Sequence, residues 1–146
     1  SLDGYIHVNI QQREPVLRVM TGEGYYVDRD GKVMPLSSKF TSRVVVATGD
    51  INKKFACEKL GPFAMKLKKE PFWDAYIEQL VVRSNEDVVM IPKVGDFRIV
   101  LGKVEGCEER LEKLMLFLKD GIAKKGWNRY KEINLKFDNQ VVCVRK

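Results

Sequence analysis

The sequence predicts an α+β fold, with two main helices on one side of a mostly antiparallel sheet. Short runs rich in β-branched and aromatic residues are separated by turn residues along most of the chain. Two longer segments, in contrast, have helical composition. The final β-rich run, residues 141–144, is followed by only two residues, so we expect an exposed edge strand at the C-terminal end of the sheet.

The first part of the chain predicts strands joined by tight turns. Apolar and polar residues alternate over residues 5–10, and Pro15 marks a joint between two units. Runs at residues 16–20, 25–28 and 33–35 are separated by glycine-containing turns, which is typical of a small β-meander.

The middle of the chain predicts a buried strand, a divided helical segment and a hairpin. Residues 44–48 form the buried run, and residues 52–70 have helical composition that we expect Gly61 and Pro62 to divide. Two further β-rich runs, residues 77–83 and 87–92, flank a short polar turn.

The last third of the chain predicts a strand, a long helix and a pair of strands. Residues 97–101 are β-rich, and apolar residues three or four apart predict an amphipathic helix over residues 105–125. Ile133, Leu135 and Phe137 then alternate with polar residues, as in a strand with one solvated face. A turn at residues 138–139 leads into the last run.

The composition leaves open one alternative function, which is based on charge. The formal net charge is +6 and the pI is near 9.2, with the densest group of lysines between Lys53 and Lys69. Such a face could bind nucleic acid or an anionic membrane surface. The other basic residues are dispersed, and no aromatic residues of the kind that stack on bases interleave with these lysines.

No pattern in the sequence predicts a catalytic, cofactor-binding or metal site. There is one histidine, and the three cysteines lie far apart, so neither forms a metal-ligand set. Asp28, Asp30 and Gly31 resemble the start of a calcium loop, but the remaining ligands are missing and a hairpin turn is the simpler interpretation. We therefore expect no catalytic, cofactor-binding or metal site, and no small-molecule substrate.

Several segments, in their order and spacing, resemble the bacterial cell-division family FtsQ, called DivIB in some bacteria. The resemblance covers nearly the whole chain and rests on residues 5–16, 26–33, 97–103, 109–111 and 133–139. Phe72 and Trp73, followed by residues 77–79, are similar to the Bacteroidetes branch of the family.

The resemblance implies a non-enzymatic scaffold of the division machinery. It implies that residues 1–13 hold the last strand of a truncated POTRA domain and that residues 14–146 form the β domain. The full-length protein would be anchored by a single transmembrane helix, absent from this fragment, with this part on the periplasmic side of the inner membrane. The implied partners are division proteins of the FtsB and FtsL type rather than nucleic acid.

In the family, the partner adds a strand to the last strand of the sheet. Carried over by position, six residues become candidates for partner binding: Phe137, Asp138, Asn139, Gln140, Val142 and Val144. Phe137 has two interpretations, an aromatic anchor for the partner or a core residue continuing the Ile133–Leu135 face. Gln140 departs from the glycine common at its position, and Arg145 stands near a position where some members carry tryptophan.

Overall fold

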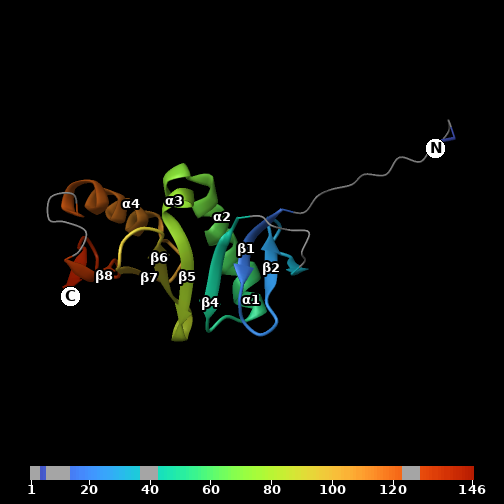
Figure 1. The fold of residues 1–146 in the computed structure, drawn as a ribbon, viewed down its shortest axis with the longest axis horizontal. Helices are drawn as coiled ribbons and strands as arrows, with labels where there is room; N and C mark the ends of the chain where they lie inside the picture. The colour runs from blue at the N-terminus through green and yellow to red at the C-terminus, as the bar shows by residue number, and fades with distance from the viewer. Residues whose placement is uncertain (1–3, 6–13, 37–42, 123–128) are drawn as a thin grey trace.

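A nine-stranded mixed sheet with helices on one face forms the molecule, as seen in a computed structural model (Figure 1). The structure describes residues 4–5, 14–36, 43–122 and 129–146. The predicted α+β fold with two main helices is confirmed. The strand predicted at residues 5–10 lies almost entirely outside the described residues, and so does the predicted helix end near residue 125.

The described elements follow one another in chain order. They are β1 (Pro15–Val19), β2 (Tyr25–Asp28), β3 (Val33–Pro35), β4 (Val45–Gly49), α1 (Lys53–Phe55), the π-helical turn η1 (Ala56–Leu60), α2 (Gly61–Lys69), α3 (Pro71–Tyr76), β5 (Ile77–Arg83), the 3-10 turn η2 (Ser84–Glu86), β6 (Asp87–Pro92), β7 (Arg98–Gly102), α4 (Glu108–Leu116), the π-helical turn η3 (Phe117–Ile122), β8 (Tyr130–Asn134) and β9 (Val142–Arg145).

The β2–β3 hairpin is closed by a buried carboxylate. Asp28 is 3% exposed, and its Oδ1 accepts hydrogen bonds of 2.9 Å from the N–H groups of Asp30 and Lys32. These bonds stabilise a tight turn, because the side chain substitutes for a main-chain acceptor. The hairpin interpretation of this segment is therefore supported over the calcium loop.

The helical segment before β5 changes type at Gly61, where α2 begins with Pro62 in its first turn as predicted, but no break separates it from the turn before it. The chain passes from α1 through η1 into α2 without a break, and Gly61 N–H donates to the carbonyl of Ala56, five residues back. Proline lacks an N–H and its ring clashes with the carbonyl four residues earlier in a regular α-helix. The wider π-helical turn before Pro62 accommodates the proline at the start of α2.

Two parallel crossovers place the helices on one face. Strands β4, β5, β7 and β8 run in the same direction, and β4–β5 and β7–β8 are parallel neighbours. The first crossover contains α1 to α3 and the second contains α4. Both crossovers advance in the same direction along the sheet, so the right-handed rule puts both on the same face. The sheet therefore contains parallel strand pairs beside a majority of antiparallel ones.

A continuous row of side chains crosses the sheet beneath the helices. The pairing register brings into line Tyr25, Val19, Ala47, Leu80, Met90, Ile99, Ile133 and Cys143. The six from Val19 to Ile133 are 0% exposed, whereas Cys143, at the end of the row, is half-buried. Leu60, Phe63 and Leu114 from the helices belong to the same core.

Two sets of ion pairs tie the first helical segment to the rest of the domain. Lys59 Nζ lies 2.5 Å from Glu105 Oε1 and 3.5 Å from Glu86 Oε2, and Lys66 pairs with Glu108 at the start of α4. The hydrogen bond from Lys59 lowers the pKa of Glu105 below its ordinary value, and the bond from Lys66 does the same for Glu108. All of these side chains are largely solvated, so each pair contributes modestly.

The lowered pKa values of Glu105 and Glu108 predict that the fold loses stability at acid pH. A lowered folded-state pKa stabilises the fold above the ordinary value of 4.5, and this contribution is lost as pH falls through the lowered value. Thermal unfolding of the unmodified chain and of Glu105→Gln/Glu108→Gln should therefore differ at neutral pH and converge at low pH. Glu112→Gln, an exposed change on α4 with no ion pair among the described residues, is the control. A constant difference at all pH values would contradict the assignment.

Candidate functional site: the C-terminal sheet edge

Strand β9 forms one edge of the sheet. It pairs antiparallel with β8, and among the described residues no strand pairs with its other side (Figure 1). The N–H of Lys146 donates to the carbonyl of Arg129, so it faces β8. Main-chain groups alternate in direction along a strand, so the N–H of Arg145 faces the open edge. The predicted exposed edge is therefore present.

The two faces of β9 differ in what lies around them. Cys143 is opposite Ile133 and packs with Val141 against the core on the helix side. Val142 is opposite Asn134 and Val144 is opposite Glu132, so both side chains lie on the helix-free side. All four residues of the 141–144 run are half-buried. A strand added at this edge would thus find apolar side chains on both of its faces.

The turn before β9 is a four-residue turn with an asparagine in the left-handed region. Gln140 N–H donates to the carbonyl of Phe137 at 3.4 Å, and Asn139 has φ of 57°. Asparagine tolerates this conformation better than most residues because its short side chain bonds locally. Since Asn139 takes up the left-handed position, the turn does not require glycine at residue 140.

Phe137 lies outside the core. Ile133 and Leu135 are 0% exposed, but Phe137 is 51% exposed, so the interpretation of Phe137 as a core residue is wrong. Strand β8 ends at Asn134, and Leu135 N–H still donates to the carbonyl of Val100 at 2.9 Å. The chain then leaves the sheet, so the strand alternation does not extend to Phe137. Asp138, Asn139 and Gln140 are also exposed.

A lysine on α4 fixes the start of this turn. Lys113 Nζ donates to the carbonyl of Leu135 at 2.9 Å and to that of Phe137 at 2.6 Å. Burial lowers the pKa of Lys113, while Asp138 opposes this by favouring the charged form. No pattern in the sequence indicates this role, because a lysine beside the apolar stripe of a helix is usually solvated. Val141 and Cys143 were predicted as part of the edge strand but not as partner-binding candidates.

The structure brings the six predicted residues to one end of the sheet in two groups. Phe137 to Gln140 form the exposed turn, whereas Val142 and Val144 lie half-buried on the helix-free face of β9. Their common feature is the hairpin that joins β8 to β9.

The lysines between Lys53 and Lys69 do not form one free cationic face. Lys59 and Lys66 are held in the ion pairs described above, and Lys53 Nζ lies 5.8 Å from the centroid of the Tyr25 ring. Lys54, Lys68 and Lys69 are exposed and form no ion pair within the described part of the chain. Half of the lysines of this stretch are therefore engaged within the domain.

An α+β domain whose sheet ends in an uncovered strand belongs to a class suited to binding an extended segment of another chain. A family model described as "FtsQ/DivIB, C-terminal related" matches residues 14–144. The chain therefore belongs to this family of bacterial cell-division proteins. The family consists of non-enzymatic division scaffolds, and its domains of this type are in general extracytoplasmic. A search of curated proteins found no match.

Within the described ranges, no helix combines the length and apolar character needed to cross a bilayer.

Replacing Lys113 should loosen the turn. In Lys113→Met the carbonyls of Leu135 and Phe137 lose a charged donor, which contributes about 1.5–3 kcal/mol in typical cases. Hydrogen exchange of the amides between residues 135 and 142 should accelerate, while exchange in β5 and β6 stays unchanged. Lys119→Met, an exposed change in η3, is the matched control. Equal exchange in the two variants would show that Lys113 does not hold the turn.

Proposed function

We propose that this domain is a non-enzymatic scaffold of the bacterial division machinery that binds a partner by strand addition at β9. Residues 14–146 act as the β domain, and residues 1–13 come from the end of a preceding POTRA domain. The partner is a division protein of the FtsB or FtsL type, bound on the periplasmic side of the inner membrane. Family membership over residues 14–144 supports the division role.

The observation that carries the mechanism is the position of β9 at the end of the sheet with one side open. Main-chain hydrogen bonds from a partner strand supply affinity at such an edge, and side chains at alternate positions supply specificity. One set of partner side chains would lie beside Cys143 and Val141, and the other beside Val142 and Val144. Phe137, half exposed on the adjoining turn, offers an aromatic anchor.

The basic-surface alternative is less well supported. Binding of nucleic acid or anionic lipid through the Lys53–Lys69 face requires several free cations close together. The ion pairs of Lys59 and Lys66 neutralise part of that face. Strong binding of the domain to DNA or anionic vesicles, falling steeply with added salt, would restore this alternative.

Removing a single outward N–H tests strand addition. Arg145→Pro deletes the main-chain donor at the open edge without touching the bond from Lys146 to Arg129, and Arg145→Ala removes the side chain alone. Overlapping peptides from an FtsB-type protein are titrated by isothermal calorimetry. The Kd of the binding peptide should rise about tenfold for the proline variant and much less for the alanine variant. Equal affinities would refute strand pairing at this position.

Phe137→Ala tests the anchor. Aromatic anchors at interface centres commonly cost 2 kcal/mol or more when truncated, so peptide affinity should fall by about thirtyfold. The melting temperature should change little, because the side chain is already 51% exposed. Val94→Ala, at a 72% exposed valine in the β6–β7 turn, is the control. Unchanged peptide affinity in Phe137→Ala would remove this residue from the site.

A further inference from the structure

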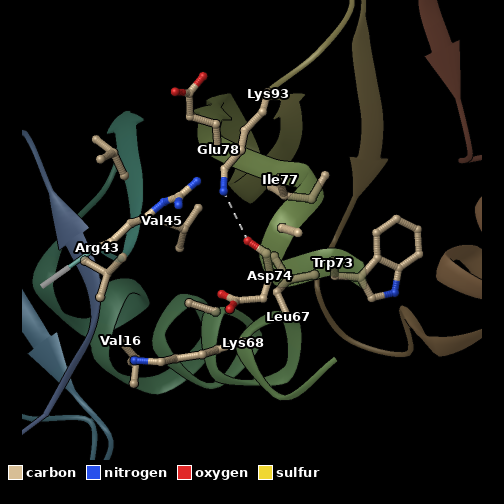
Figure 2. A pocket seen from close by; sticks show the side chains of 14 residues that line it. Val16, Arg43, Val45, Leu67, Lys68, Trp73, Asp74, Ile77, Glu78 and Lys93 are labelled. Carbon is tan, nitrogen blue, oxygen red and sulfur yellow. Dashed lines mark hydrogen bonds between the residues drawn. The ribbon is translucent and has the colours of Figure 1, made fainter. Parts of the chain in front are cut away.

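A second binding feature lies in the middle of the sheet, away from β9. A hollow of about 400 Å³ opens where β1, β4 and β5 begin, and helices α2 and α3 close it on one side (Figure 2). Its volume falls in the range of about 300–1,000 Å³ typical of sites for small ligands or single side chains with their backbone. Strands β6, β7 and β8 separate β5 from β9, so this hollow is distinct from the proposed edge site.

The hollow exists because β4 and β5 are not paired at their first residues. Their parallel ladder begins at Val46 and Gln79. Before that point Val44 and Val45 line the hollow from one strand, and Ile77 and Glu78 line it from the other. Backbone from two strand ends therefore borders the opening, and an extended segment could reach it.

The floor of the hollow is apolar. Leu67 and Ala64 from α2 and Ile77 from β5 are all at most 5% exposed, whereas the indole of Trp73 on α3 is directed away from Arg43 and Lys93 in Figure 2. A ligand that reaches this floor must therefore present an apolar group to gain from the contact.

Charged side chains surround that floor, with cations in excess. Arg43, Lys68 and Lys93 line the hollow together with Asp74 and Glu78. In Figure 2 the Arg43 and Lys93 side chains both point into it, while the Glu78 carboxylate reaches the upper rim and the Asp74 carboxylate lies lower. Lys93 Nζ has a 3.4 Å contact with the main-chain oxygen of Asp74, and Arg43 forms no ion pair within the described part of the chain.

Two cations aimed into one hollow form a site for an anion with planar oxygens. A guanidinium binds a carboxylate with two parallel hydrogen bonds, and an ammonium adds a second charge. Val45 and Glu78 lie before the first pair of the β4–β5 ladder, so their facing main-chain groups are not paired with each other. The amide groups of a peptide can bond with such main-chain groups, whereas a fatty acid has no amides, so a peptide fits this lining better than a fatty acid.

We propose that the hollow binds an acidic residue and the apolar residue next to it in an extended segment of a partner protein. Arg43 and Lys93 hold the carboxylate, and the apolar neighbour lies on Leu67 and Ile77. This gives the domain a second peptide-binding site that does not depend on β9, and it allows two partner segments to bind at once.

The experiment titrates two peptides into the ¹⁵N-labelled 146-residue chain and follows amide signals. The acidic probe is acetyl-Val-Leu-Asp-amide, and the matched probe is acetyl-Val-Leu-Asn-amide, which differs only in charge. The acidic probe should shift the main-chain signals of Val44, Val45 and Glu78. Its Kd should be about tenfold lower than that of the amide probe, since charge-assisted hydrogen bonds are the stronger ones.

Arg43→Glu should abolish the preference for the acidic probe, whereas Lys54→Glu, with the same change of charge on an exposed residue of α1, should retain it. Equal binding of the two probes by the unmodified chain would overturn the proposal, as would shifts confined to other regions. Binding of octanoate with the same shifts but not of either peptide would overturn the choice of a peptide. None of these readouts involves β9, so the proposed edge site can fail without affecting them.

Discussion

The cross-sheet row from Tyr25 to Cys143 holds the strands of the sheet in register beneath the helices. Every strand except β3 contributes one side chain to it, so the row fixes the register of seven successive strand pairs at once. A slip of one residue in any pair would move a buried side chain to the solvated face. At one end of the row Tyr25 is buried, with 8% of its surface exposed, whereas at the other end Cys143 is only half-buried.

The two ends of the sheet are protected unequally. Strand β3 is only three residues long, and its last residue, Pro35, has no N–H to offer. Short edge strands and proline are features that natural sheets use against pairing with other chains. Strand β9 is also short, but it contains no proline, and three of its four residues have β-branched or thiol side chains. This asymmetry favours β9 over β3 as the edge for the proposed partner pairing.

The sequence predicted those parts of the fold that depend on local patterns. The meander from β1 to β3, the β5–β6 hairpin and the return of the chain through residues 141–144 follow from alternation and turn residues. The passage of the helix through Pro62 was not predictable from proline chemistry alone, because a π-helical turn has no clear sequence signature. The exposure of Phe137 was left undecided for another reason. Period-two alternation continues in the sequence after the strand has left the sheet, so the pattern does not show where β8 ends.

Features that arise between segments far apart in the chain could not be predicted from the sequence. Lys113 meets the carbonyls of Leu135 and Phe137 because the β7–β8 crossover places α4 over the end of β8. The hollow between β4 and β5 likewise arises from where a parallel ladder begins, which no residue type specifies.

The link between α4 and the β8–β9 hairpin bears on the proposed strand addition at β9. Strand addition gains most when the edge is held in a pairing geometry before the partner arrives, because ordering a loop during binding costs free energy. The charged bonds from Lys113 attach the start of the turn to a helix whose Leu111 and Leu114 are packed in the core. Asn139 then reverses the chain in a conformation that its side chain tolerates, and β9 returns along β8. The helix thus holds the start of the β8–β9 hairpin without covering the unpaired side of β9.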